Sequence, residues 1–177
     1  MASTSRNRDD HTYVLTGNVE HSDSLGNTGT LRDGDVQWMT AGSGIIHQEM
    51  PKGNAAGQMH GFQLWANLPR DQKMCTPRYQ DVGSEHITSL TDDDGTHIRV
   101  IAGDYRGYRG PVDGIDTDPL YLDIALPANT SRRFPFDPRR QGFAYIFEGS
   151  ASFGNASRPF GVNVEKEFAG EELKIRD

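Results

Sequence analysis

His47 and Glu49 are the two residues whose types and spacing best fit metal chemistry. They stand two positions apart in the stretch 45–50, which begins with two β-branched isoleucines and is expected to form a β-strand. Because alternate side chains of a strand point to the same face, an imidazole and a carboxylate would leave it side by side. Iron(II) oxygenases often bind their metal through two histidines and one carboxylate. The competing interpretation is a surface strand pair, and the spacing alone leaves both open.

Short strands separated by turns surround this pair. The strand-like stretches are residues 11–15, 18–22, 36–39, 45–50, 61–68, 97–102, 120–126 and 143–147. Short strands at this spacing are typical of a β-barrel or a sandwich. The polar opening, residues 1–11, predicts a disordered tail, and the glycine-rich stretch 70–119 predicts an irregular connector with a few strands.

One pattern occurs twice along the chain. Residues 13–17 and 145–149 both combine aromatic and aliphatic residues in a strand that ends at a glycine turn. Such strands are common, so chance is one interpretation, and the sharper one is duplication of a single barrel.

Composition limits the class of protein. The chain has 177 residues, enough for one large domain or two small ones, and its 20 glycines and 9 prolines favour strands and turns over long helices. A net charge of -7 argues against direct binding to nucleic acid, and no apolar run approaches the length of a membrane span. A lone cysteine, Cys75, cannot form an intramolecular disulfide, so we expect an intracellular location, cytoplasmic or nuclear.

Two long blocks, residues 34–51 and 60–69, closely resemble the signature of the pirin family, and residues 77–80 continue the match. A weaker resemblance extends through residues 143–154. The resemblance implies a bicupin, two β-barrels in tandem, of which the first binds iron and the second is free of metal. Pirins are linked to quercetin 2,3-dioxygenase activity and, in eukaryotes, to nuclear co-regulation of transcription factors.

The same resemblance implies that His47 and Glu49 are metal ligands, the first as a neutral imidazole and the second as an anion. Pirins supply two further histidines from a His-Pro-His segment shortly before the first strand matched here. The corresponding positions in this chain are Ser3, Thr4 and Ser5. We therefore expect a damaged metal site in which iron(II) binds weakly or not at all, in a chain that resembles a pirin truncated at both ends.

The remaining histidines offer one substitute ligand. His11 has the inward parity of the missing histidines if the register holds, although it lies several residues further along the strand. We expect His21 to form hydrogen bonds in a turn, His60 to pack in a strand, and His86 and His97 to face solvent.

Other residues that could line or furnish a site have structural alternatives. Trp38, Met39 and Phe62 are candidates for a pocket wall, and core packing is the expected role of each. Cys75 is expected to be an unreactive thiol, and Asp123 a solvated residue that points out of its strand.

Together these features predict an all-β fold of two cupin-like barrels. The first, residues 12–69, is incomplete at its N-terminus, and the second, residues 120–177, is partial. The expected function is that of an iron-dependent, quercetin 2,3-dioxygenase-type oxidoreductase acting on a flavonol, with no catalytic residue assigned beyond the metal ligands. The alternative is a non-catalytic nuclear co-regulator whose partner is a transcription factor. Neither function requires direct contact with nucleic acid or a membrane.

Overall fold

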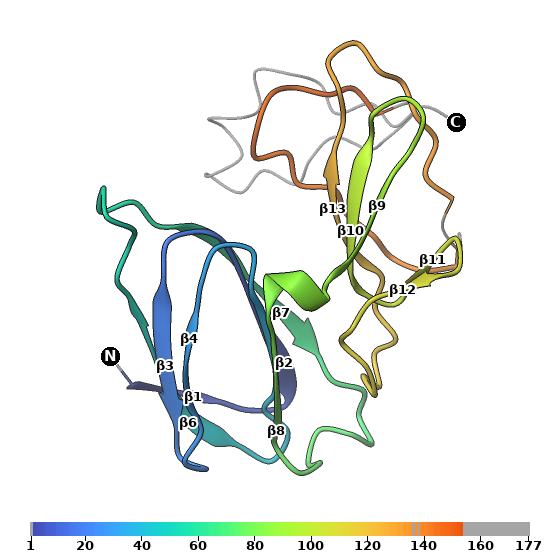
Figure 1. Cartoon of the computed structure of the whole chain (residues 1–177). Helices are drawn as coiled ribbons and strands as arrows, with labels where there is room; N and C mark the ends of the chain where they lie inside the picture. Colours follow the sequence, from blue (N-terminus) through green and yellow to red (C-terminus); the bar gives the residue numbers. More distant parts are fainter. Residues whose placement is uncertain (1, 136, 138, 154–177) are drawn as a thin grey trace. The chain divides into compact units, whose positions relative to one another are not determined.

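Strands dominate the computed structural model, which describes residues 2–135, 137 and 139–153 (Figure 1). The described residues include a single short 3-10 helix, Ser84–His86, and no helix long and apolar enough to cross a membrane. The all-β, cupin-like fold expected from the sequence is confirmed.

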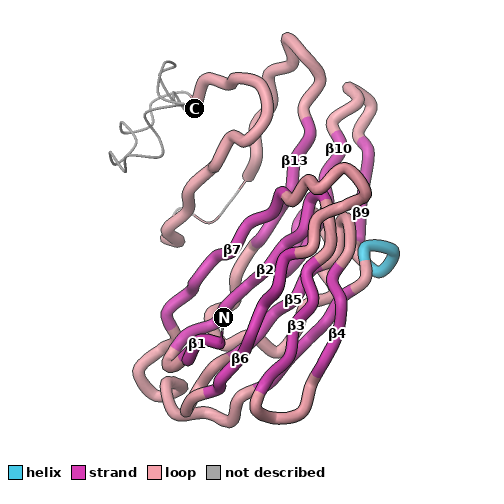
Figure 2. Tube along the Cα trace, turned by 90° about the vertical axis from the view of Figure 1, so that its left-hand side faces the viewer, coloured by secondary structure: helices cyan, strands magenta, loops and turns pink. Residues whose placement is uncertain are grey.

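Two four-stranded antiparallel sheets form the first barrel (Figures 1 and 2). One sheet contains, in spatial order, β1 (Ala2–Ser5), β6 (Ile45–Pro51), β3 (Val19–Asp23) and β4 (Thr28–Leu31). The other contains β7 (His60–Asn67), β2 (Arg8–Thr16), β5 (Val36–Thr40) and β8 (Arg78–Val82). Side chains from both sheets meet in the interior, where Val14 of β2 packs with Val19 and Leu31 of the facing sheet.

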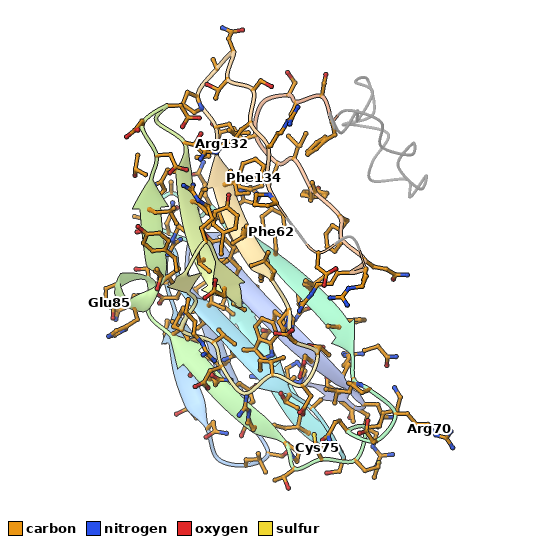
Figure 3. All side chains as sticks on the ribbon, turned by 90° about the vertical axis from the view of Figure 1, so that its right-hand side faces the viewer. Phe62, Arg70, Cys75, Glu85, Arg132 and Phe134 are labelled. Carbon is orange, nitrogen blue, oxygen red and sulfur yellow. The ribbon has the colours of Figure 1, made fainter. Side chains whose placement is uncertain are left out.

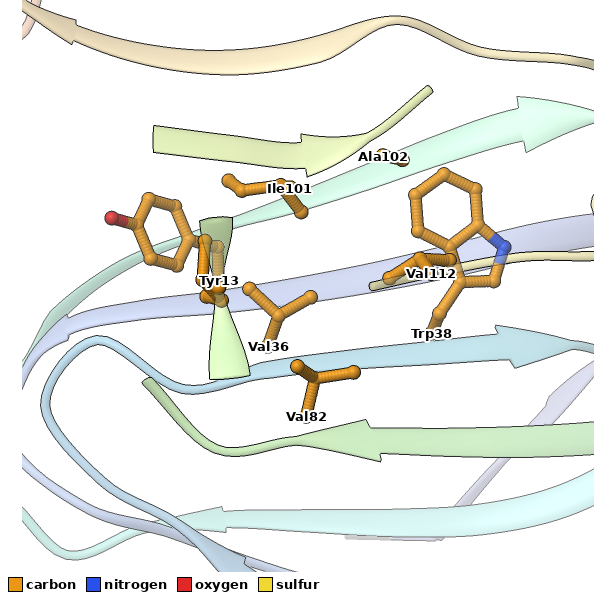
Figure 4. Close-up of a cluster of buried hydrophobic side chains, with 8 residues drawn as sticks. Tyr13, Val36, Trp38, Val82, Ile101, Ala102 and Val112 are labelled. Atoms are coloured by element: carbon orange, nitrogen blue, oxygen red, sulfur yellow. The ribbon is translucent and has the colours of Figure 1, made fainter. Parts of the chain in front are cut away.

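Strand β2 is buried on both of its faces. Six consecutive residues, Asp9–Val14, are buried, so β2 shows no alternation between buried and exposed positions. Val14 points into the barrel, whereas Tyr13 packs with Val36 and Trp38 on the opposite face (Figure 4). The barrel wall therefore separates two layers of side chains.

A second group of strands covers this outer face. β10 (His97–Ala102) pairs with both β9 (Thr88–Thr91) and β13 (Tyr121–Ala125), and β11 (Asp104–Tyr105) forms a small hairpin with β12 (Tyr108–Arg109). Ile101, Ala102 and Val112 complete the core cluster that contains Trp38 and Val82 (Figure 4).

A polar network joins the two groups of strands. The Tyr13 hydroxyl donates a hydrogen bond to Asp123 over 2.6 Å and accepts one from Arg99 over 2.6 Å. Arg99 also donates to the carbonyl oxygen of Gly34. The prediction that Asp123 points outward into solvent is therefore wrong, because its carboxylate meets a buried tyrosine on a neighbouring sheet.

The opening and the middle of the chain are more regular than expected. Where the sequence predicts a disordered tail, residues 2–5 form β1 and residues 8–11 begin β2. The edge of β6 supplies hydrogen-bond partners that this polar sequence does not reveal. The expected connector, 70–119, contributes β8 to the first barrel and β9 and β10 to the next sheet.

The chain divides into two units, Met1–Pro127 and Ala128–Asp177. Strand β13, expected to begin the second barrel, belongs to the first unit. Residues 143–147, expected to form a strand, lie in irregular structure. The end of the expected second barrel, residues 154–177, lies outside the described residues.

Candidate metal centre

Strand β6 turns His47 and Glu49 towards the interior of the first barrel. Ile45 and His47 are buried, whereas Ile46 between them is 53% exposed, which identifies the inward and outward faces of the strand. Glu49 follows His47 by two residues and continues the inward row. The two side chains therefore share one face, as their spacing predicts.

Glu49 is held from across the barrel by two hydrogen bonds. The Thr12 hydroxyl donates to Oε1 of Glu49 over 2.7 Å, and the Gln63 side-chain amide donates to Oε2 over 2.7 Å. Thr12 lies on β2 and Gln63 directly opposite it on β7, so both donors come from the facing sheet. The two bonds fix the orientation of the carboxylate, and each oxygen retains further acceptor capacity.

His47 lies beside Ser3, the residue that matches one of the missing histidines. In the antiparallel pairing of β1 with β6, Ser3 stands opposite His47, and 3.5 Å separates Ser3 Oγ from His47 Nε2. The His47 side chain is almost fully buried, and its Nδ1 has no hydrogen-bond partner among the described residues. Ser3 itself is exposed, so this side of the imidazole lies near the rim of the barrel.

The donor chemistry of His47 and Glu49 fits a divalent metal ion. A buried, unpaired ring nitrogen is costly, and coordination would satisfy it. A carboxylate held by two donors is a pre-oriented ligand. Among the described residues, however, no group of three or more histidine, cysteine, aspartate and glutamate side chains is arranged to hold a metal ion. The pair thus supplies two ligands of an incomplete set.

Ser5, the other serine at a matching position, is built into a cluster that we call the Arg8 cluster: Ser5, Arg8, Asp10 and Trp65. The Ser5 hydroxyl donates to Asp10 over 2.5 Å and accepts from Arg8 over 2.9 Å, and Arg8 Nε donates to Asp10 over 2.6 Å. Ser5 is fully buried and Asp10 is 4% exposed, so this ion pair is largely shielded from water. The guanidinium of Arg8 lies 3.7 Å from the ring centre of Trp65.

His11 does not replace a missing ligand. Its ring stacks on Trp38 with 3.2 Å between ring centres, on the outer face of β2, whereas Thr12 is the neighbour that reaches Glu49. The prediction that His11 points into the barrel is therefore wrong, and Thr12 points inward instead. Burial lowers the pKa of His11 to about 3, which keeps the ring neutral at physiological pH.

His21 is an interior residue that the sequence assigned to a turn. It stands on β3 opposite Glu49, with its Nε2 3.3 Å from a carboxylate oxygen of Asp81 and its ring stacked on Tyr79. Although burial raises the pKa of Asp81, the nearby His21 ring and the hydrogen bond that Gln37 donates outweigh it and lower that pKa overall. His21 follows the apolar Val19 by two positions, and this strand spacing could have indicated that both side chains point inward.

His21 leans away from the candidate ligands. Its Nε2 lies over Gly29 of β4, where a Cβ atom would collide with the ring. β4 and β6 flank β3 on opposite sides, so the ring points to the side away from Glu49. A glycine at position 29 leaves the room that this orientation needs.

The other candidate residues lie apart from this centre. His86 and His97 are exposed, as expected, and His60 at the start of β7 is exposed too, although its ring packs edge-on against Phe62 with 5.6 Å between ring centres. Cys75 is half-buried in the loop before β8, and burial raises the pKa of its thiol (Figure 3).

The residues considered as a pocket wall lie in the hydrophobic core instead. Trp38 and Met39 are buried in two different hydrophobic clusters. Phe62 packs against the cluster that contains Trp38. Their expected packing role is therefore confirmed.

Comparisons with known proteins agree with this architecture. The family model described as pirin matches residues 5–66. A pirin-like protein of Caulobacter vibrioides is 42% identical over 139 residues, which cover 78% of this chain and 50% of that protein. A pirin-like protein of Arabidopsis thaliana is 40% identical over 147 residues, covering 82% of this chain and 47% of that protein.

Among solved structures, the quercetin 2,3-dioxygenase from Acinetobacter baumannii is 37% identical with a TM-score of 0.56. That match covers 65% of this chain and 41% of the solved one. The chain thus spans about half the length of the curated relatives it matches.

Proposed function

Since residues 5–66 of this chain belong to the pirin family, we propose that it is a metal-binding oxygenase of the quercetin 2,3-dioxygenase type whose metal site is incomplete. The observation that carries the proposal is the pair on β6: an almost fully buried imidazole, His47, and a carboxylate, Glu49, on the same inward face. The likeness to the Acinetobacter baumannii quercetin 2,3-dioxygenase supports the reaction class.

In this proposal His47 is a neutral imidazole ligand and Glu49 an anionic ligand of iron(II). The bound metal would supply open positions at which a flavonol and dioxygen meet. The remaining work falls to the protein: Thr12 and Gln63 orient the carboxylate of Glu49. The barrel wall around His47 excludes water from its Nδ1.

A second candidate function is favoured by Ser3. A hydroxyl group, a poor ligand for iron(II), stands beside the His47 ring nitrogen where the family resemblance implies a histidine. A non-catalytic co-regulator that contacts a transcription factor requires a protein surface and tolerates this replacement. In that case the pirin fold would serve as a binding scaffold.

A measurement of oxygen uptake distinguishes the oxygenase from the non-catalytic co-regulator. The chain is loaded anaerobically with iron(II), mixed with quercetin and exposed to air, with His47→Ala as the blank for metal-independent oxidation. His86→Ala, which removes an exposed histidine, is the matched control. We expect slow uptake by the unmodified chain and by His86→Ala, and none above background by His47→Ala. Equal rates in all three proteins would contradict the oxygenase and favour the scaffold.

A further inference from the structure

We propose that Trp65 is the platform on which a planar, uncharged phenolic ligand stacks beside Glu49. This inference deepens the proposed function and rests on it for the identity of the neighbouring centre. It concerns β7, whose inward face carries both a group that touches Glu49 and a large aromatic ring open to solvent.

Gln63 and Trp65 occupy consecutive inward positions on β7. Gln63 is identified as inward by its hydrogen bond to Glu49, and Trp65 follows two residues later on the same face. The pairing with β2 agrees, because Gln63 stands opposite Thr12 and Trp65 opposite Asp10. Two residues of a strand span about 7 Å, so the indole lies one ring's length from the residue that holds Glu49.

The indole of Trp65 is both fixed and accessible. The Arg8 guanidinium stacks on it at 3.7 Å and is itself held by Asp10 and Ser5, which are buried. Despite this contact, Trp65 remains 59% exposed. A ring fixed from one side and exposed elsewhere offers a stacking surface at little cost in conformational entropy.

The surrounding groups select the chemistry of the ligand. The Gln63 amide oxygen can accept a hydrogen bond from a phenolic hydroxyl. The Arg8 charge is already paired with Asp10, and Glu49 adds a further carboxylate, so an aromatic anion would be repelled. A flat, neutral polyphenol therefore fits better than an aromatic carboxylate or an aliphatic ligand.

Calorimetric titration with quercetin tests the platform, on the full chain first freed of metal with a chelator and then loaded with iron(II) under anaerobic conditions. Taxifolin carries the same hydroxyl groups on a framework that is not planar, and it serves as the matched ligand. Trp65→Ala removes the ring and Trp65→Phe keeps a smaller one. Ile46→Ala removes an exposed apolar side chain from the outward face of β6 and is the control variant.

We expect quercetin to bind the metal-free chain more tightly than taxifolin does. Trp65→Ala should weaken quercetin binding about tenfold, Trp65→Phe by less, and Ile46→Ala should leave it unchanged. Equal affinities of the unmodified chain and Trp65→Ala for quercetin would overturn the platform, as would failure of quercetin to bind the unmodified chain in either state. A dimer that Trp65→Ala converts to monomer would show that a second copy covers the ring, and would also overturn it. Loss of quercetin binding in Trp65→Ala without any oxygen uptake by the iron-loaded chain would uphold the platform and reject the oxygenase.

Discussion

Ser3 stands directly opposite His47 on the neighbouring antiparallel strand, with its hydroxyl oxygen 3.5 Å from His47 Nε2. The resemblance to pirins aligns Ser3 with a metal-binding histidine, and the strand register independently brings Ser3 to the proposed ligand. Ser5, two residues later, is fully buried and bonded to Arg8 and Asp10. The two serines are therefore not equivalent, and they predict different outcomes when replaced.

Ser3→His is expected to raise the affinity of the chain for iron(II) roughly a hundredfold, because a full ligand set contributes on the order of ten kcal/mol and one restored ligand supplies a share of it. Ser3 is exposed, so the larger ring has room, and β1 already holds the backbone in place. Calorimetry under anaerobic conditions measures the change. Thr4→His, on the opposite face of β1, should give no gain, and Ser3→His combined with Glu49→Ala should lose most of it. A gain that survives removal of Glu49 would place the metal elsewhere.

Ser5→His is expected to destabilise the fold by about 1 to 3 kcal/mol without improving metal binding. The position is fully buried, so an imidazole overpacks it and breaks the hydrogen bonds that Ser5 makes with Asp10 and Arg8. Urea unfolding gives the change, with the exposed Thr4→His as the reference. An unchanged urea midpoint would show that the Arg8 cluster rearranges around the imidazole without loss of stability.

The shared face of His47 and Glu49 could be predicted from the sequence because side chains two positions apart in a strand point the same way. His11 could not, since β2 is buried on both faces and its pattern carries no sign of which face points inward. The sequence predicts that His11 points into the barrel, whereas in the structure its neighbour Thr12 does, a difference of one residue that moves every side chain of the strand to the other face.

Strand β1 and the interior position of His21 depend on partners distant in sequence. Ala2–Ser5 has no strand-like apolar pattern and becomes a strand because β6 offers an edge to pair with. His21 is positioned by Asp81 and Tyr79, which belong to a strand some sixty residues later in the chain, β8. Local patterns cannot reveal such contacts.

Thr12→Val is expected to weaken iron(II) binding about tenfold while the fold is retained. Valine has the shape of threonine but cannot donate to Glu49, so the carboxylate keeps only the hydrogen bond from Gln63. The same change at Thr30, an exposed residue of β4, is the control. Metal titration followed by a thermal melt separates the two effects. Unchanged metal affinity in Thr12→Val would mean that Glu49 does not depend on this hydrogen bond.

His11 is expected to make the fold sensitive to acid. Burial lowers its pKa from 6.5 to about 3, so between these values the unfolded chain carries a proton on His11 that the folded chain lacks. The unfolded state then binds more protons, and the free energy of unfolding falls as the pH decreases, by about 1.4 kcal/mol per pH unit within that window. Above pH 6.5 the contribution is constant, because the ring is neutral in both states.

His11→Phe removes this titration and keeps an aromatic ring stacked on Trp38. Its free energy of unfolding, measured with urea from pH 7.5 to 4, should fall less steeply below pH 6.5 than that of the unmodified chain. His86→Phe, at an exposed histidine, should leave the slope of the unmodified chain unchanged. If the curves of His11→Phe and the unmodified chain run parallel, His11 takes up its proton in the folded state, and its ring must then have access to water on the outer face of β2.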